Sequence, residues 1–171
     1  MSNFEDDYKR IVNVKKVVRA VKKIGNFAMY SSSEDSTLLI TEYFILNLNE
    51  LQSWEIQCAL LVKELGKWYT VDKEGPIAGK EVEQEKIDSY YRAVNAEGLE
   101  IVGFTELYLN NISVYAADGK FVGIKRDYME MLGDMSAVRK SPFNSYLVVS
   151  ESHLIAPAKQ PESIHLAPML F

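Results

Sequence analysis

The chain has 171 residues, 47% of them hydrophobic and 25% charged, so it can bury the core of one ordinary globular domain or of two small ones. The formal net charge of −5 excludes a polycation that coats nucleic acid over its whole surface. One cysteine, Cys58, is too few for a disulfide framework or a thiolate metal site.

The segment from Tyr8 to Ile24 predicts a long amphipathic helix. It carries seven basic residues and no acid; since these contribute +7 to a total of −5, the remainder of the chain carries −12. At about 100° per residue, five basic side chains share one face, and valines and isoleucines fill the other. These five are Lys15, Lys16, Arg19, Lys22 and Lys23. Asp6 and Asp7 suit the positive end of the helix dipole, and Gly25 provides a stop.

This positive face has two interpretations, and the sequence leaves both open. It is either a surface that faces an anion, with nucleic acid first, or an ordinary solvated face. Solvated helices usually mix charges of both signs. A basic face on an otherwise acidic chain suits a protein that meets DNA on one side only.

Two strands and a helix are predicted between residues 27 and 65. The β-branched and aromatic run Thr37–Leu46 predicts a strand, paired with Phe27–Tyr30 across the polar turn 32–36. Asn49 and Gln52 form a capping box that opens a helix over 50–65, in which apolar residues recur at spacings of three and four. These residues are Leu51, Trp54, Cys58, Leu61 and Leu65. A strand over 54–62 is the alternative, and the periodicity argues against it. We expect Cys58 to be buried as a small hydrophobe.

A strand at Trp68–Val71 precedes the clearest break in the chain, Asp72–Lys80, which holds two glycines and a proline. The next helix is predicted over Glu81–Asn95. Its apolar stripe consists of Ile87, Tyr90, Tyr91 and Val94. The two tyrosines suit core packing better than an exposed partner surface.

From Leu99 onward the sequence favours strands, at 99–104, 107–109, 112–116, 121–124, 146–150 and 153–156. Asp118-Gly119 predicts a hairpin turn, and Lys125–Leu132 a short helix. The apolar segment Ser163–Phe171 predicts a final strand that also lines an apolar groove.

These elements predict an α+β fold, with a largely antiparallel sheet and a few helices packed on one face. Residues 1–171 form a single domain in this prediction, with halves 1–71 and 99–171 joined by the loop and helix at 72–98. No apolar run approaches the roughly 20 residues that span a bilayer, and no signal peptide is recognisable. We expect a cytoplasmic protein that does not enter a membrane.

The sequence offers little sign of catalysis. His153 and His165 lie on predicted strands without nearby cysteines or paired acids, which is more typical of surface or core histidines than of ligands. No phosphate-binding, metalloprotease or nucleophile-elbow motif occurs. The expectation is therefore a protein without catalytic residues, metal or cofactor.

Five segments resemble parts of the bacterial DNA sliding clamps, the β subunits of DNA polymerase III. Three of them, in the same order as in the family, are Val122–Leu132, Ser141–Val149 and His165–Phe171. Val14–Ile24 is similar to a basic helix that lines the clamp channel, and Leu38–Tyr43 to the strand after it. The sequence departs from the family at Ala167 and Leu170, where clamps have methionine and arginine, and residues 49–110 have no evident counterpart.

The resemblance implies a domain of two helix-plus-sheet repeats whose helices face double-stranded DNA. It implies that Lys125 and Arg126 join the five basic residues of the first helix against the duplex. It also implies an apolar groove that receives short peptides from polymerases and other partners. The residues that would line this groove are Leu166, Pro168, Met169 and Leu170. A clamp ring contains several such domains, so this chain would need to form a homo-oligomer to close one.

Two functional hypotheses remain open. The first is a non-catalytic, DNA-associated, clamp-like binding protein of phage or mobile-element origin, with duplex DNA and replication or other host proteins as partners. The second is a small regulatory or inhibitory protein that binds a host protein through its basic helix. An enzyme with scattered site residues ranks third.

Overall fold

The computed structural model describes residues 11–33, 36–117, 120–133, 136–140 and 146–158. Its helices are α2 (Val14–Ile24), α3 (Glu50–Leu60), α4 (Gln84–Val94) and α5 (Arg126–Leu132). The strands of the first half are β1 (Asn26–Ser33), β2 (Ser36–Ile40), β3 (Phe44–Leu48), β4 (Lys67–Asp72) and β5 (Gly75–Glu81). The strands of the second half are β6 (Glu100–Leu109), β7 (Ile112–Ala117), β8 (Lys120–Lys125), β9 (Val138–Lys140), β10 (Leu147–Val149) and β11 (His153–Ile155).

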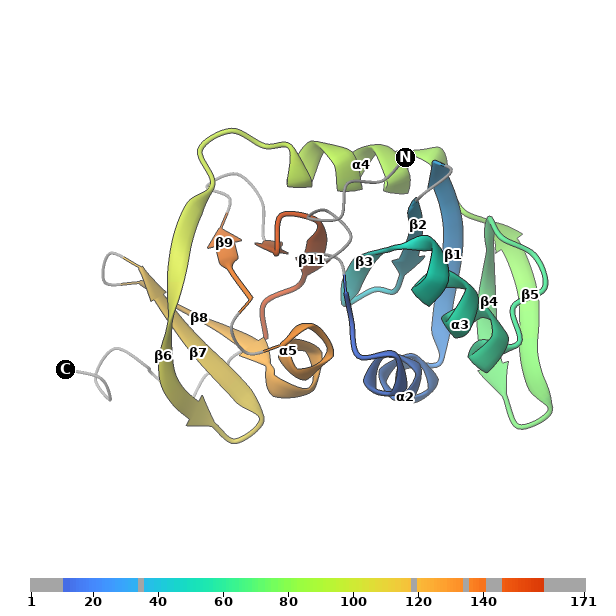
Figure 1. Ribbon diagram of the computed structural model, residues 1–171, viewed down its shortest axis with the longest axis horizontal. Helices are drawn as coiled ribbons and strands as arrows, with labels where there is room; N and C mark the ends of the chain where they lie inside the picture. The colour runs from blue at the N-terminus through green and yellow to red at the C-terminus, as the bar shows by residue number, and fades with distance from the viewer. Residues whose placement is uncertain (1–10, 34–35, 118–119, 134–135, 141–145, 159–171) are drawn as a thin grey trace.

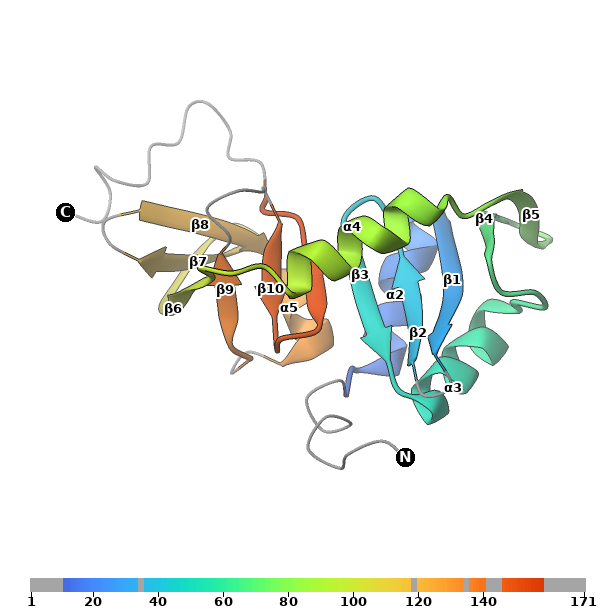
Figure 2. The same cartoon turned by 90° about the horizontal axis from the view of Figure 1, so that it is seen from above.

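All of these strands belong to one antiparallel sheet, in the order β5-β4-β1-β2-β3-β11-β10-β9-β6-β7-β8. The α+β class and the antiparallel sheet predicted from the sequence are therefore confirmed. Figure 1 shows α2 and α5 on one side of the sheet and α4 on the opposite side. Seen from above, α4 lies across strands from both halves (Figure 2).

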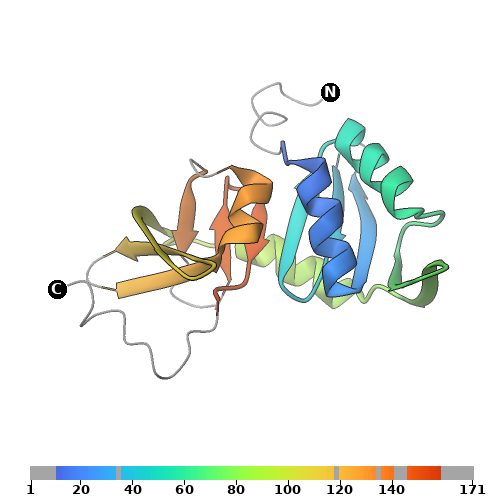
Figure 3. The same ribbon diagram turned by 90° about the horizontal axis from the view of Figure 1, so that it is seen from below.

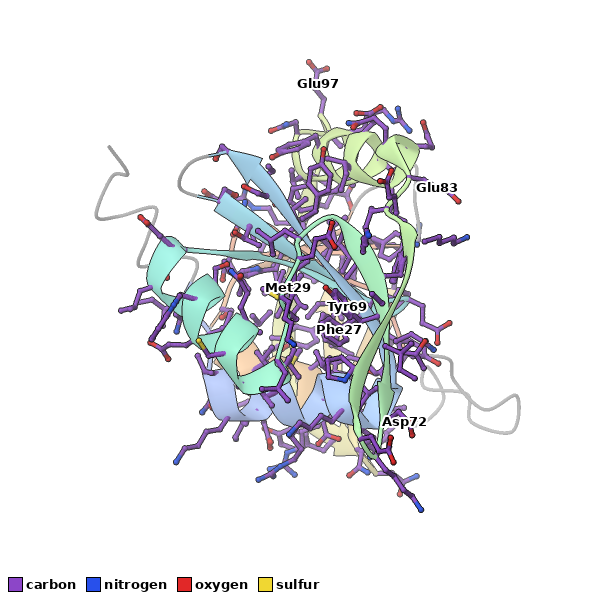
Figure 4. The ribbon with its side chains drawn as sticks, turned by 90° about the vertical axis from the view of Figure 1, so that its right-hand side faces the viewer. Phe27, Met29, Tyr69, Asp72, Glu83 and Glu97 are labelled. Carbon is purple, nitrogen blue, oxygen red and sulfur yellow. The ribbon has the colours of Figure 1, made fainter. Side chains whose placement is uncertain are left out.

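Both faces of the sheet are covered because consecutive residues of its central strands are apolar and point to opposite faces in turn. Phe27, Met29 and Leu39 belong to the core under α2, α3 and α5, whereas Leu38 and Ile40 belong to the core under α4. The rings of Phe27 and Tyr69 stack with their centroids 5.6 Å apart, between the sheet and the helices that cover it (Figure 4). Three helices thus share one face of the sheet, and α4 alone packs on the other.

The chain runs twice through the same order of elements, a helix followed by three antiparallel strands. α2 precedes β1, β2 and β3, and α5 precedes β9, β10 and β11. The third strands of the two runs pair with each other, with Phe44 opposite Ile155. The centre of the sheet is therefore built from two similar units that meet at β3 and β11.

The basic helix is shorter than the sequence predicts. Asn13 is extended (φ −83°, ψ 101°), and its side-chain oxygen accepts a hydrogen bond from the Lys16 N–H, which makes it the N-cap. The backbone of Val12 is held by the side-chain amide of Gln52, at 3.0 Å and 2.7 Å. The helix therefore begins at Val14, and residues 8–10 lie outside the described residues. Gly25 ends it with a positive φ of 92°, as expected.

The strand predicted over 37–46 is wrong, because a turn divides it into β2 and β3. The Thr41 N–H donates to the Phe44 carbonyl at 2.8 Å, and the Thr41 hydroxyl oxygen accepts from the Phe44 N–H at 3.0 Å. This side-chain hydrogen bond closes a turn that a β-branched and aromatic run does not reveal. The pairing with β1 is confirmed, with Met29 opposite Leu39.

The helix predicted over 50–65 ends at Leu60, since Leu61 takes a left-handed conformation (φ 59°). Asn49 caps its start as predicted, accepting from the Gln52 N–H at 2.8 Å. The expectation that Cys58 is buried is wrong, because its side chain is exposed. The core-facing residues of α3 are Ser53, Ile56 and Leu60.

Other boundaries differ in detail. The break at 72–80 holds a tight turn and most of β5, which pairs with β4. α4 is shorter than 81–95, and Ile87 and Tyr90 are buried in it as expected. The core position expected for Tyr91 is wrong, because its side chain is exposed. The strands predicted at 99–104 and 107–109 form one strand, β6, with an irregular register between Phe104 and Tyr108. The final strand predicted over Ser163–Phe171 lies outside the described residues.

Candidate nucleic-acid interface

The face of α2 that points away from the sheet is basic. Val17, Ala20 and Val21 are buried against the core, and these fix the orientation of the helix. Four of the five predicted basic side chains are exposed, and Lys16 is half-buried. α2 contains no acidic residue. The helix therefore presents a row of like charges along its outer side.

α5 lies beside α2 on the same face of the sheet (Figure 3). The two helices are joined where α2 begins, because the Asn13 N–H donates to the Met131 carbonyl at 2.7 Å. Glu130 of α5 forms a second link, since its carboxylate lies 3.3 Å from Lys16 Nζ and 3.3 Å from Arg126 Nε. These contacts hold α2 and α5 together, so that their outer sides form one surface.

A groove of about 1100 Å³ lies between the two helices and the loops beside them. Four of the predicted basic residues line it: Lys16, Arg19, Lys23 and Lys125. Its walls also contain the acids Glu42, Asp127 and Glu130 and the aromatic rings of Tyr43 and Tyr128. The groove is thus basic on its α2 side and mixed in charge on its α5 side.

The remaining predicted cations lie outside the groove. Lys15 and Lys22 are exposed on α2. The guanidinium of Arg126 lies 4.6 Å from the ring centroid of Tyr108 and also pairs with Glu130. Arg126 is therefore held by neighbouring side chains rather than directed freely outward.

The described cations differ in how strongly they are neutralised. Lys16 and Arg126 share the carboxylate of Glu130. Lys15, Arg19, Lys22 and Lys23 form no ion pair with any residue that the structure describes. A cation without a carboxylate partner can bind an external anion without first losing that partner. The four residues without a described ion-pair partner therefore carry the least neutralised positive charge on α2.

Tyr128 supports the groove from below. Burial, followed by the neighbouring Tyr43, Asp127 and Glu42, raises the pKa of Tyr128 to about 12. Its ring packs edge-on against Phe44 at 5.2 Å, and Lys125 Nζ lies 5.3 Å from its centroid. The Tyr128 ring therefore helps to position Lys125.

The predicted peptide groove cannot be compared with the structure, since Leu166, Pro168, Met169 and Leu170 lie outside the described residues. His165 lies there too. His153 is buried in β11, and its Nδ1 accepts a hydrogen bond from the Asn47 N–H at 3.0 Å. Among the described residues, no group of three or more His, Cys, Asp or Glu side chains is placed to hold a metal ion. No described helix is long and apolar enough to cross a membrane.

Sequence reasoning missed several residues of the groove, among them Tyr43 and Glu130. Tyr43 was placed inside a strand, although it belongs to the turn between β2 and β3. Glu130 follows Arg126 by four residues, a spacing that places two side chains on one helix face and could have indicated their ion pair. The ion pair between Glu130 and Lys16 joins residues 114 positions apart, so no pattern of neighbouring residues in the sequence could have indicated it.

Comparison with protein-family models, with curated proteins and with solved structures gives no match to this chain. The function must therefore be inferred from the residues themselves.

Proposed function

We propose that the protein is a non-catalytic, clamp-like protein that associates with double-stranded DNA through the outer face of α2 and the neighbouring start of α5. The observation that carries this proposal is the row of four unpaired cations on α2, in a chain whose formal net charge is −5. Acidic side chains such as Glu83 and Glu97 project from the opposite side of the molecule (Figure 4). A protein with this charge distribution would approach a duplex with one face only.

The order of the elements supports the same proposal. The sequence resembles the sliding clamps, and that resemblance implies two helix-plus-sheet repeats with their helices on the DNA side. Two runs of a helix followed by three strands, with α2 and α5 side by side, agree with that implication. The proposal includes a cytoplasmic location, a homo-oligomeric state, partners from replication and, by resemblance alone, a peptide site at Leu166, Pro168, Met169 and Leu170.

Lysine and arginine on α2 would contact phosphate oxygens rather than base edges. Such contacts position a protein on DNA without reading its sequence. They also release counterions, so affinity falls as salt rises, with a slope in log–log form of about −0.9 per phosphate contacted. Binding through this face is therefore expected to be independent of sequence and strongly dependent on salt.

The proposal is tested by reversing charge on α2. The triple variant Arg19→Glu, Lys22→Glu, Lys23→Glu should weaken duplex binding at low salt by roughly tenfold or more, because three phosphate contacts are lost. Circular dichroism should show an unchanged fold, since these side chains are exposed or line the groove. Fluorescence anisotropy of a labelled duplex measures the affinity.

The matched control makes the same change of total charge elsewhere. Lys73, Lys80 and Lys120 are exposed and lie on the β4–β5 turn, on β5 and on β8. Their replacement by glutamate should leave most of the affinity in place. Equal losses in the two triple variants would mean that net charge alone governs binding, and unchanged binding in the α2 variant would refute the proposed face.

A further inference from the structure

The groove between α2 and α5 contains an exposed aromatic ring on a fixed backbone. Tyr43 lines the groove, and 43% of its side chain is exposed. Its N–H donates to the hydroxyl oxygen of Thr41 at 3.1 Å, and its carbonyl accepts from the N–H of Ala156 at 2.9 Å. The centroid of its ring lies 6.3 Å from that of the buried Tyr128. Tyr43 therefore offers a flat apolar surface to a ligand in the groove.

The cations of the groove lie along the wall that α2 forms beside α5 (Figure 3). Lys16, Arg19 and Lys23 recur at spacings of three and four residues, which places them in one row on the helix. Lys16 is paired with Glu130, whereas Arg19 and Lys23 form no ion pair with any described residue. Arg19 and Lys23 are about 6 Å apart along the helix axis. Their long side chains can therefore contact successive phosphates of one strand.

The opposite wall has a different chemistry. Glu42 and Asp127 line the groove from the β2–β3 turn and from α5. Their carboxylates repel phosphate, but they accept hydrogen bonds from the N–H groups of a base. Ile112 and Pro157 add apolar surface between the charged walls. A nucleotide in the groove is thereby oriented, with its phosphates on α2 and its base toward Tyr43.

We propose that the groove binds single-stranded DNA, with successive phosphates on Arg19 and Lys23 and an unpaired base stacked on Tyr43. Its volume of about 1100 Å³ is sufficient for a nucleotide, since pockets for small ligands usually occupy about 300–1,000 Å³. Both faces of a base in a duplex are covered by the neighbouring base pairs, so only an unpaired base can stack on the ring. Cations that follow the backbone, together with an aromatic side chain, are typical of sites for single strands.

The inference rests on the proposed function in one respect, because a duplex and a single strand would use the same cations, Arg19 and Lys23. The two modes of binding differ in their use of Tyr43. A duplex on the outer face of α2 contacts the protein through its phosphates, whereas a single strand also places a base inside the groove. Substitution of Tyr43 therefore separates the two modes.

Fluorescence anisotropy with two labelled probes tests the proposal. One probe is oligo(dT), whose bases do not pair with one another, and the other is a duplex. Tyr43→Ala should weaken binding of oligo(dT) by about five- to a hundredfold, the loss expected when one stacked base loses its aromatic partner. It should leave duplex affinity unchanged, because the phosphate contacts remain. Tyr43→Phe should bind oligo(dT) as the wild type does, since the ring is retained.

Tyr91→Ala is the matched control. Tyr91 lies on α4, on the opposite face of the sheet, and its side chain is exposed to a similar extent, 37%. Removal of this ring should change the affinity for neither probe.

Four results would overturn the proposal. They are no binding of oligo(dT) by the wild type, an unchanged affinity for oligo(dT) in Tyr43→Ala, an equal loss of duplex binding in that variant, and a loss that Tyr43→Phe shares. Binding of oligo(dT) that depends on Tyr43, without any binding of the duplex, would contradict the proposed function and support this inference.

Photocrosslinking gives a second test that needs no substitution. Oligo(dT) with 5-iodouracil at one position should become linked to Tyr43 on irradiation, because this base reacts with an aromatic side chain on which it stacks. Mass spectrometry of the digested protein identifies the linked residue. No crosslink, or crosslinks only to aromatic residues outside the groove, would refute the proposed position of the base.

Discussion

Tyr128 illustrates how one side chain serves both the core and the surface of the proposed interface. Its ring packs against Phe44 beneath the groove, and burial raises the pKa of its hydroxyl to about 12 from an ordinary value of 10.0. Neighbouring Asp127 and Glu42 act in the same direction. A phenolate at this position would be repelled by these two carboxylates, with little water to screen the charges. It would also repel DNA phosphates.

This pKa predicts how stability depends on alkaline pH. The folded state binds the phenolic proton more tightly than the unfolded state does, so the contribution of Tyr128 is complete below pH 10 and is lost as the pH rises from 10 toward about 12. Urea unfolding across this range should show a steeper fall in the free energy of unfolding for the wild type than for Tyr128→Phe. Equal slopes would contradict the assignment.

At the scale of single elements, periodicity predicted helices over 8–24 and 50–65, of which the structure shows Val14–Ile24 and Glu50–Leu60. The basic residues predicted to share one face of the first helix lie on the outer side of α2. It could not show which side of α3 meets the sheet, because two sets of residues have helical spacing. The set with Leu51, Trp54 and Cys58 is the more hydrophobic, yet the core takes Ser53, Ile56 and Leu60. The orientation of α3 depends on tertiary contacts, such as the bonds between Gln52 and Val12, that no local pattern contains.

The orientation of α3 makes a matched pair of substitutions informative. Ile56 is fully buried, so Ile56→Ala should lower the free energy of unfolding by about 2–5 kcal/mol through lost contacts and a cavity. Leu51 is exposed, so Leu51→Ala should change it by less than about 0.5 kcal/mol. Urea denaturation measures both. A large cost at Leu51 with a small cost at Ile56 would mean that α3 is turned the other way.

At the scale of the whole molecule, the sequence predicted the α+β class and the β1–β2 pairing, both of which depend on local patterns. It could not predict that β3 pairs with β11, since those strands are about a hundred residues apart and pair through backbone groups that every residue has. The neighbouring positions of α2 and α5, and hence the groove between them, follow from that pairing. The cations could thus be found in the sequence, but their shared groove could not.

The salt dependence of duplex binding tests the central claim most directly. Four unpaired cations on α2 predict a slope of roughly −3 to −4 for the logarithm of the binding constant against the logarithm of salt concentration. The slope and the affinity should be the same for duplexes of unrelated sequence. No association with duplex DNA at low salt, or an association that salt does not weaken, would contradict the account and favour a protein partner for the basic face.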